Sequence, residues 1–151
     1  MFKFLSAMLV LAMVASGGCG CGRHPTWTYQ GDFHRAIAKA DRMVIVDAGF
    51  DCYGRAPKAK TLFEITKPDE VRQFAEKLDF QKGQTLAVCN CNGYPRVDWY
   101  EGKTRVVTAS IQHAQAIRWK GFHADAKLTP TSTQWLLQWL AEHGVDLEKM
   151  K

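Results

Sequence analysis

The sequence predicts a single α+β domain: a mixed, mainly antiparallel sheet of about five strands that includes a three-stranded meander, packed by about three helices. Two observations predict this class. Segments with helical periodicity and segments typical of strands follow one another in the order helix, strand, strand, helix, strand, strand, strand, helix. The connections between the last three strands are too short for a crossover helix, so these strands should pair antiparallel. A chain of 151 residues, 46% of them hydrophobic, has the length and composition of one domain.

The N-terminal segment, residues 1–18, is predicted to be a signal peptide outside this domain. Its only charge is Lys3, which precedes the apolar run 4–15. That run is too short to span the hydrocarbon core of a membrane, which needs about 20 helical residues. Residues 19–31 contain glycines and a proline but few aliphatic side chains, and are interpreted as a tether. The folded domain is then expected over residues 32–147.

The end of the signal segment resembles a bacterial lipoprotein signal. In Ser16-Gly17-Gly18-Cys19 small residues precede a cysteine, although the family usually has Leu where this chain has Ser16. The resemblance implies that Cys19 carries lipid and holds the exported protein on a membrane of the cell envelope. Cys21 is an alternative attachment site, and cleavage after Gly17 or Gly18 would instead release a soluble secreted or periplasmic protein.

The first helix and the first strand of the domain are predicted close together. Apolar residues from Phe33 to Ala40 recur three and four positions apart, which predicts a helix, and Asp32 is a residue type that can cap its N-terminus. The continuous apolar run 43–46 predicts a strand that is covered on both faces. Residues 47–60 break the pattern with two glycines and a proline, and are interpreted as a loop.

The second helix is predicted after a short strand at residues 61–65. Residues 66–69, Thr-Lys-Pro-Asp, resemble a capping box with an early proline. The apolar residues that follow recur at helical spacing and should face the core: Val71, Phe74, Ala75 and Leu78. The meander is predicted next, over residues 85–91, 96–100 and 104–111.

The final helix is predicted to begin at Thr129 or Ser132 and to end at Gly144. Four large apolar residues recur in it at helical spacing and are expected to face the core: Trp135, Leu136, Trp139 and Leu140. An alternative interpretation makes the tryptophan pair part of an exposed interface.

Two segments resemble thioredoxin-like proteins. In residues 32–52 an amphipathic helix leads into an apolar strand and a loop cysteine, and residues 93–103 look like the proline-led hairpin of that family. The loop reads Cys52-Tyr53-Gly54-Arg55, so the second cysteine of the family motif is absent, and there is no space for the helix that the family places before the hairpin. A thioredoxin-like fold is the alternative.

The most unusual local feature is Cys89-Asn90-Cys91. In an extended segment two such cysteines would have their Cα atoms about 6.5 Å apart, at the far limit for a disulfide. A bond between them would be strained and therefore easily reduced, as in a thiol–disulfide oxidoreductase with a C-x-C site. Alternatively Asn92 and Gly93 bend the chain, and both sulfurs bind one metal ion.

A metal site would need further ligands, and Cys52 and His113 are the candidates. Both are expected at one rim of the sheet together with Cys89 and Cys91, and such a set suits zinc or copper. The alternatives are a structural disulfide between Cys52 and either Cys89 or Cys91, as is common outside the cytoplasm, and free thiols.

Residues 113–123 concentrate cations and aromatic rings. Arg118, Trp119 and Lys120 are candidates for binding an anionic ligand or lipid head groups. The alternative interpretation is a loop in which the aromatic rings pack on the sheet while the cations remain solvated.

Composition and motifs exclude several classes of function. A formal net charge of +5 is far from a nucleic-acid-binding signature, and no nucleic-acid partner is expected. The chain lacks G-x-S-x-G, H-E-x-x-H and a phosphate-binding glycine loop, which argues against classical hydrolases, zinc proteases and nucleotide enzymes. The sequence thus predicts an exported, lipid-anchored binding or structural module of the cell envelope, with metal binding or thiol–disulfide exchange as alternatives.

Overall fold

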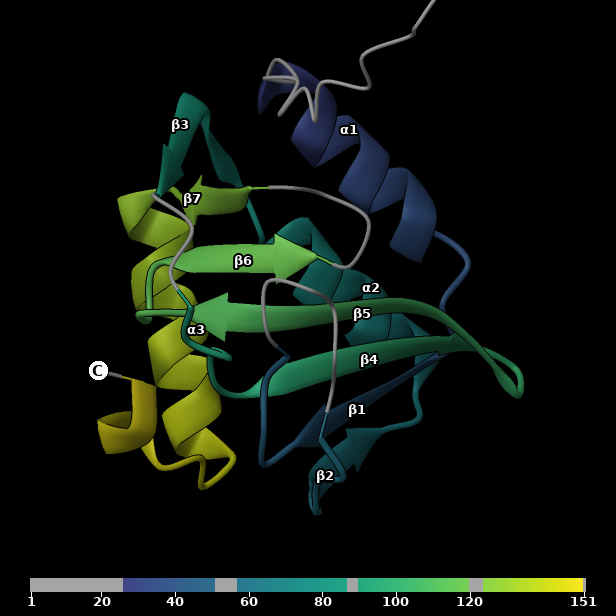
Figure 1. Ribbon diagram of the computed structural model, residues 1–151. Coiled ribbons are helices and arrows are strands. Elements are labelled where there is room, and N and C mark those ends of the chain that lie inside the picture. Colours follow the sequence, from purple (N-terminus) through teal and green to yellow (C-terminus); the bar gives the residue numbers. More distant parts are fainter. Residues whose placement is uncertain (1–25, 51–56, 87–89, 120–123, 151) are drawn as a thin grey trace, which may run out of the picture.

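The structure, a computed structural model, describes residues 26–50, 57–86, 90–119 and 124–150 (Figure 1). The helices in these ranges are α1 (Thr26–Ile37), α2 (Pro68–Glu76), α3 (Pro130–Glu142) and the 3-10 helix η1 (Leu147–Met150). The strands are β1 (Arg42–Val46), β2 (Thr61–Ile65), β3 (Phe80–Leu86), β4 (Arg96–Glu101), β5 (Thr104–Gln112), β6 (Ala116–Trp119) and β7 (Asp125–Leu128). The predicted signal peptide lies outside the described residues. No helix in the described part is long and apolar enough to cross a membrane.

The strands form one seven-stranded sheet in the order β2-β1-β4-β5-β6-β7-β3. All neighbouring pairs of these described strands are antiparallel. The predicted single α+β class is therefore confirmed. The prediction of about five strands was too low, and the sheet, as far as it is described, has no parallel pair.

The strands that the sequence analysis missed are β6 and β7. Each has only four residues, and the charged Arg118 and Asp125 interrupt their apolar pattern. The meander therefore runs from β4 to β7, and β3 lies at the edge of the sheet, where Phe80 pairs with Leu128 of β7. The predicted meander was wrong in its first strand, because β3 does not pair with β4.

The thioredoxin-like alternative is not the architecture of this sheet. Residues 93–103 do lead into a hairpin, β4–β5, after a cis peptide bond between Tyr94 and Pro95. The hairpin continues directly into β6 and β7, however, and β3, the preceding strand of the chain, lies at the far edge of the sheet. The resemblance was thus confined to short segments.

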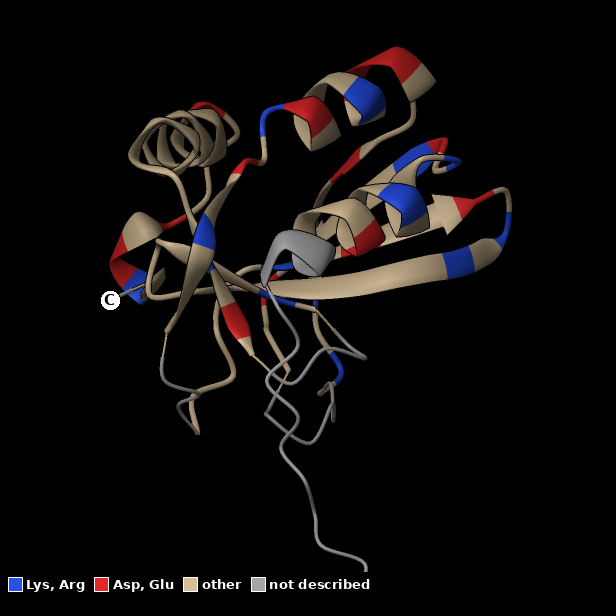
Figure 2. Ribbon diagram, turned by 90° about the horizontal axis from the view of Figure 1, so that it is seen from above, with Lys and Arg blue, Asp and Glu red and all other residues tan. Residues whose placement is uncertain are grey.

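The three α-helices lie on one side of the sheet (Figure 2) and share a single hydrophobic core with it. Trp99 of β4 is at its centre, with ring centroids 5.5 Å from Phe33 of α1 and 6.3 Å from Phe74 of α2. The largest fully buried members of this core include Met43, Ile45, Leu78, Ile111, Leu128, Leu136 and Leu140. Burial of these side chains is the main source of stability.

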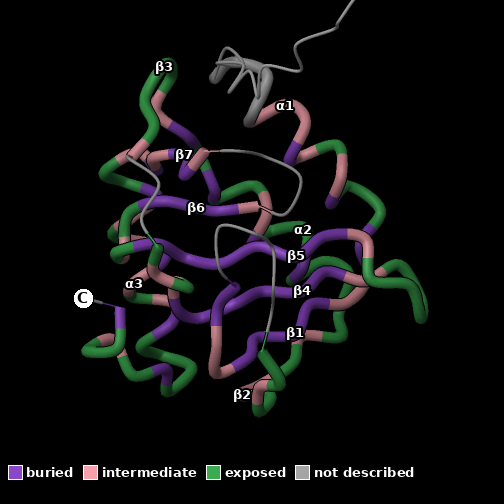
Figure 3. The backbone as a smooth tube through the Cα atoms, in the orientation of Figure 1, coloured by how far each residue is buried: buried purple, intermediate pink, exposed green. Residues whose placement is uncertain are grey.

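The opposite side of the sheet buries polar residues. Side chains alternate along a strand, so the residues between the core positions of β4 to β7 point away from the helices. Seven of them are polar and no more than 7% exposed: Arg96, Asp98, Thr108, Ser110, Gln112, Arg118 and Asp125. Figure 3 shows how continuously the central strands are buried. Such groups need hydrogen-bond partners, and the strand register provides several of them.

Most predicted elements are confirmed, but two predicted caps are wrong. α1 begins at Thr26, so Asp32 lies inside the helix, where it forms an ion pair with Arg35. The N-cap of α2 is Lys67, which makes no side-chain capping hydrogen bond, although Pro68 does begin the helix. α3 begins as predicted, and the Thr129 side chain caps it.

Candidate functional site

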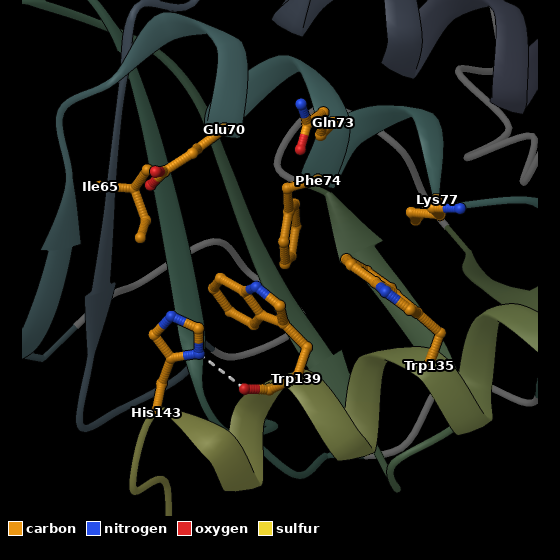
Figure 4. A pocket seen from close by; sticks show the side chains of 8 residues that line it. All are labelled: Ile65, Glu70, Gln73, Phe74, Lys77, Trp135, Trp139 and His143. Carbon is orange, nitrogen blue, oxygen red and sulfur yellow. Dashed lines mark hydrogen bonds between the residues drawn. The ribbon is translucent and has the colours of Figure 1, made fainter.

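A pocket of about 390 Å³ lies between α2, α3 and the end of β2 (Figure 4). Its volume is in the range of small-molecule sites. It is lined by Ile65, Glu70, Gln73, Phe74, Lys77, Trp135, Trp139 and His143. All of these side chains come from described residues, and three elements supply most of them.

Aromatic rings form one wall and the floor of this aromatic pocket. Trp135 and Trp139 are half-buried and lie one turn apart on α3, with ring centroids 6.2 Å apart and planes 28° apart. The buried Phe74 of α2 is in edge contact with both rings, at 5.4 and 4.6 Å. Both indoles therefore rest on a packed aromatic base and keep part of their surface accessible.

The imidazole of His143 extends the aromatic wall at the end of α3. It is stacked on Phe63 with the ring centroids 4.8 Å apart, and its centroid is 4.2 Å from that of Trp139. Its Nδ1 is 2.8 Å from the backbone oxygen of Trp139. A carbonyl oxygen can only accept a hydrogen bond, so Nδ1 carries the proton and Nε2 of the neutral ring is an acceptor.

The other wall of the pocket is polar. Glu70, Gln73 and Lys77 follow one another at the spacing of a single face of α2, and their side chains border the pocket (Figure 4). Lys67 lies 2.8 Å from the carboxylate of Glu70, and this hydrogen bond raises the pKa of Lys67. The lining contains one carboxylate and one ammonium group, so its formal charge is zero when His143 is neutral.

The geometry of α3 explains why two of its four large apolar residues line the pocket. Leu136 and Leu140 are fully buried against the sheet, as predicted. Trp135 and Trp139 precede them by one residue, which rotates their side chains by about 100° around the helix axis, toward α2. The prediction that all four face the core is confirmed for the leucines, whereas the tryptophans are only partly buried: they pack against the edge of the core and also line the pocket. The only sign of the pocket in the sequence is the spacing of four residues between Trp135 and Trp139, which places both indoles on one side of α3.

Cys91 and His113 form the part of the predicted cysteine rim that the structure describes. The sulfur of Cys91 is 3.4 Å from Nε2 of His113 and 3.1 Å from Oε1 of Gln112. His113 is placed by the turn after β5, where its φ is 47°. The two residues are thus in contact, as predicted. Cys52 and Cys89 lie outside the described residues, as does the lipid-attachment candidate Cys19.

The state of Cys91 bears on the predicted metal site. Cys91 is disulfide-bonded, and its partner cysteine is not among the described residues, which therefore contain no complete disulfide. Within the described ranges no group of three or more His, Cys, Asp or Glu side chains is arranged to hold a metal ion. The four-residue metal site accordingly remains a prediction.

A smaller pocket of about 210 Å³ lies beside Cys91 and His113, and Lys149 and Met150 of the C-terminal segment form part of its lining. Lys149 hydrogen-bonds Asp47 at 3.0 Å, which raises the pKa of its ammonium group, and lies over the ring of Tyr94. Burial raises the pKa of the Tyr94 hydroxyl. No sequence pattern predicted that η1 would approach this rim.

Arg118 and Trp119 do not converge on one site. The guanidinium of Arg118 donates to both carboxylate oxygens of Asp125, at 2.7 and 2.8 Å, and to the backbone oxygen of Cys91 at 2.7 Å. Trp119 points to the other side of the sheet, where its ring is 5.6 Å from that of Phe33. Lys120 lies outside the described residues. The arrangement supports a structural role for Arg118, and joint anion binding remains only a prediction.

A second buried charge cluster lies on the polar side of the sheet and was not predicted. Asp98 accepts a hydrogen bond from Thr108 at 2.8 Å and forms ion pairs with Arg96 and Arg105 at 3.2 and 3.4 Å. Nη1 of Arg96 is buried without a hydrogen-bond partner. Arg96 and Asp98 lie on the same face of β4, two residues apart, and the β4–β5 register adds Thr108 and Arg105 from the neighbouring strand.

Comparisons of the chain with protein-family models, curated proteins and solved structures give no match. The class of the protein is therefore defined by its fold and its site. It is an α+β domain with an antiparallel sheet, one helical layer and an aromatic pocket within that layer.

Proposed function

We propose that this protein is an exported, lipid-anchored binding module of the cell envelope, and that its ligand site is the aromatic pocket. One observation carries the proposal: the indoles of Trp135 and Trp139 line a pocket of about 390 Å³ and remain partly accessible, although they pack on the buried Phe74. Apolar surface that stays in contact with water on a rigid base is available for a ligand.

The proposed anchor rests on the N-terminal sequence. Cys19 follows the small residues of the signal segment, and the first described helix begins at Thr26. Two or more acyl chains would give a stable membrane attachment, because each buried CH₂ contributes about 0.8 kcal/mol. The pocket would then be presented at the membrane surface on the folded domain.

The anchor is tested by metabolic labelling with radioactive palmitate in a bacterial host. The native chain should incorporate the label, Cys19→Ser should lose it, and Cys21→Ser should retain it. Labelling that persists in Cys19→Ser and disappears in Cys21→Ser would identify Cys21 as the lipid-attachment site. Absence of label from the native chain would overturn lipid anchoring.

The pocket is tested by a mixed small-molecule screen read from the indole N–H signals of an NMR spectrum. Compounds that bind should shift the signals of Trp135 and Trp139. The signal of Trp99 serves as an internal control, because its Nε1 is buried beneath the helices. Shifts that occur only at other tryptophans, or at none, would contradict the proposed ligand site.

Metal binding is the second candidate function, and the contact of 3.4 Å between the Cys91 sulfur and the His113 imidazole favours it. Thiolate and imidazole together suit zinc or copper(I), and Cys91 must be reduced to act as a ligand. The reduced protein should then bind about one equivalent of Zn²⁺, and both Cys91→Ser and His113→Ala should weaken binding at least about tenfold. His34→Ala is the control. Equal metal content in all variants, measured by atomic emission, would exclude this site.

A further inference from the structure

We infer that the ligand of the aromatic pocket is a neutral saccharide, whose ring stacks on Trp139 and Trp135 and whose hydroxyl groups bind the polar side chains of α2. This inference rests on the proposed function, because it names the chemical class that the pocket would accept. Three properties of the pocket carry it: the aromatic surface, the opposite polar row, and the balance of charge.

The aromatic surface has the shape that a sugar ring requires. The two indoles are stacked, with their ring centroids 6.2 Å apart and their planes inclined by 28°, so their accessible surfaces lie next to each other in the pocket. The C–H groups on one face of a pyranose carry a partial positive charge and are attracted to the negative face of an aromatic ring. Phe74 holds both indoles in place, so little side-chain freedom is lost when a ligand binds.

The polar row provides both kinds of hydrogen-bonding group. Glu70 accepts, Lys77 donates, and the amide of Gln73 does both. Hydroxyl groups also donate and accept, so each can find a partner along this face of α2. An apolar helix from another protein would instead bury these three side chains without partners, which is costly.

The balance of charge argues against an ionic ligand. Glu70, which is acidic, and Lys77, which is basic, both line the pocket. An anionic ligand would be repelled by the first group and a cationic ligand by the second, whereas a neutral polyhydroxylated ligand is repelled by neither. Glu70 already pairs with the exposed Lys67 beside the pocket, which lowers its attraction for a second cation.

The test uses isothermal titration of the detergent-solubilised full chain with three probes. Chitotriose is the neutral trisaccharide, its fully deacetylated triamine has the same ring skeleton with positive charges, and an amphipathic helical peptide represents a protein partner. Saturable binding is expected for chitotriose, with at least about tenfold weaker binding of the triamine and no binding of the peptide.

Variants place the saccharide in the pocket. Trp139→Ala should weaken chitotriose binding about tenfold or more, and Trp139→Phe should recover part of it. Glu70→Gln, which changes an exposed group and leaves the aromatic base intact, should weaken binding severalfold. Glu76→Gln is the matched control, because this residue is also exposed on α2 and does not line the pocket.

The outcomes separate the inference from the proposed function. Binding of the triamine or the peptide, but not of chitotriose, with shifts of the Trp135 and Trp139 indole signals, would overturn the saccharide class and retain the pocket as a ligand site. Chitotriose binding that Trp139→Ala and Glu70→Gln do not change would place the sugar elsewhere and overturn the inference. No binding of any probe, together with no indole shift in the broader screen, would overturn both.

Discussion

Replacing Asp125 with Ala is expected to lower the free energy of unfolding by about 3–5 kcal/mol. The side chains of Asp125 and Arg118 are only 1% and 4% exposed, and the carboxylate accepts two hydrogen bonds from the guanidinium. Without the carboxylate the guanidinium is a buried charge that has lost both of these hydrogen bonds and its counter-ion. Urea unfolding followed by far-ultraviolet circular dichroism measures the loss.

Two further variants show that burial of the charge is the cause. Asp69→Ala removes a carboxylate of comparable size from an exposed ion pair with Arg72 and should change the free energy of unfolding by no more than about 0.5 kcal/mol. The double variant Arg118→Met, Asp125→Leu removes both charges and should regain most of the stability. If Asp125→Ala costs no more than Asp69→Ala, the pair does not have the role assigned to it.

The same ion pair bears on the cysteine rim. Arg118 donates to the backbone oxygen of Cys91, so it links the polar side of the sheet to the segment that carries the sulfur. Loss of Asp125 should therefore also shift the backbone NMR signals around Cys91. The ion pair supports a structural role for Arg118, and its predicted part in anion binding stays a prediction.

The second large effect is expected for Phe33→Ala, which should lower the free energy of unfolding by about 3–5 kcal/mol. Phe33 is fully buried, and its ring is in edge contact with Phe80, Trp99 and Trp119, at centroid distances of 5.7, 5.5 and 5.6 Å. The substitution leaves a cavity between α1 and the sheet, since three rigid rings cannot close it. Urea unfolding measures the loss.

Hydrogen exchange distinguishes local from global effects of this variant. α1 is attached to the sheet largely through Phe33 and Ile37, so exchange of its amides should accelerate more than that of β4 or β5. Arg35→Ala, on the exposed side of the same helix, is the control and should leave exchange unchanged. Equal exchange of α1 in Phe33→Ala and the native protein would contradict the assigned packing.

Sequence patterns were sufficient to predict those helices and strands whose apolar residues follow a single clear periodicity. β1 is a continuous apolar run and is buried on both faces, and α3 has both its Thr129 cap and its buried leucine stripe where they were predicted. The pattern failed for β6 and β7, because buried charged residues occupy strand positions where apolar residues would be expected. Their charges are neutralised across strands, and a single strand cannot show this.

The candidate site was predictable only in part. Proximity of Cys91 and His113 was predicted from the ends of two strands and is confirmed, since the turn after β5 brings His113 to the sulfur. The aromatic pocket was not predicted: the alternative for Trp135 and Trp139 was an exposed interface, and the polar row opposite them was not foreseen. A helix pattern gives the direction of each side chain around its own axis, but not which neighbouring helix it meets.

By itself, the sequence determined the α+β class, the helical layer and the apolar strand β1, because these follow from local periodicity and composition. The signal segment and the lipid attachment at Cys19 stay predictions from the sequence. The order of the strands, the pairing of Arg118 with Asp125 and the placement of Glu70 opposite Trp139 were decided only by the tertiary structure. The strand order and the placement of Glu70 depend on contacts between segments far apart in the chain, and the Arg118–Asp125 pair depends on the register of β6 and β7. The energies of these contacts are set by burial, which no local pattern specifies.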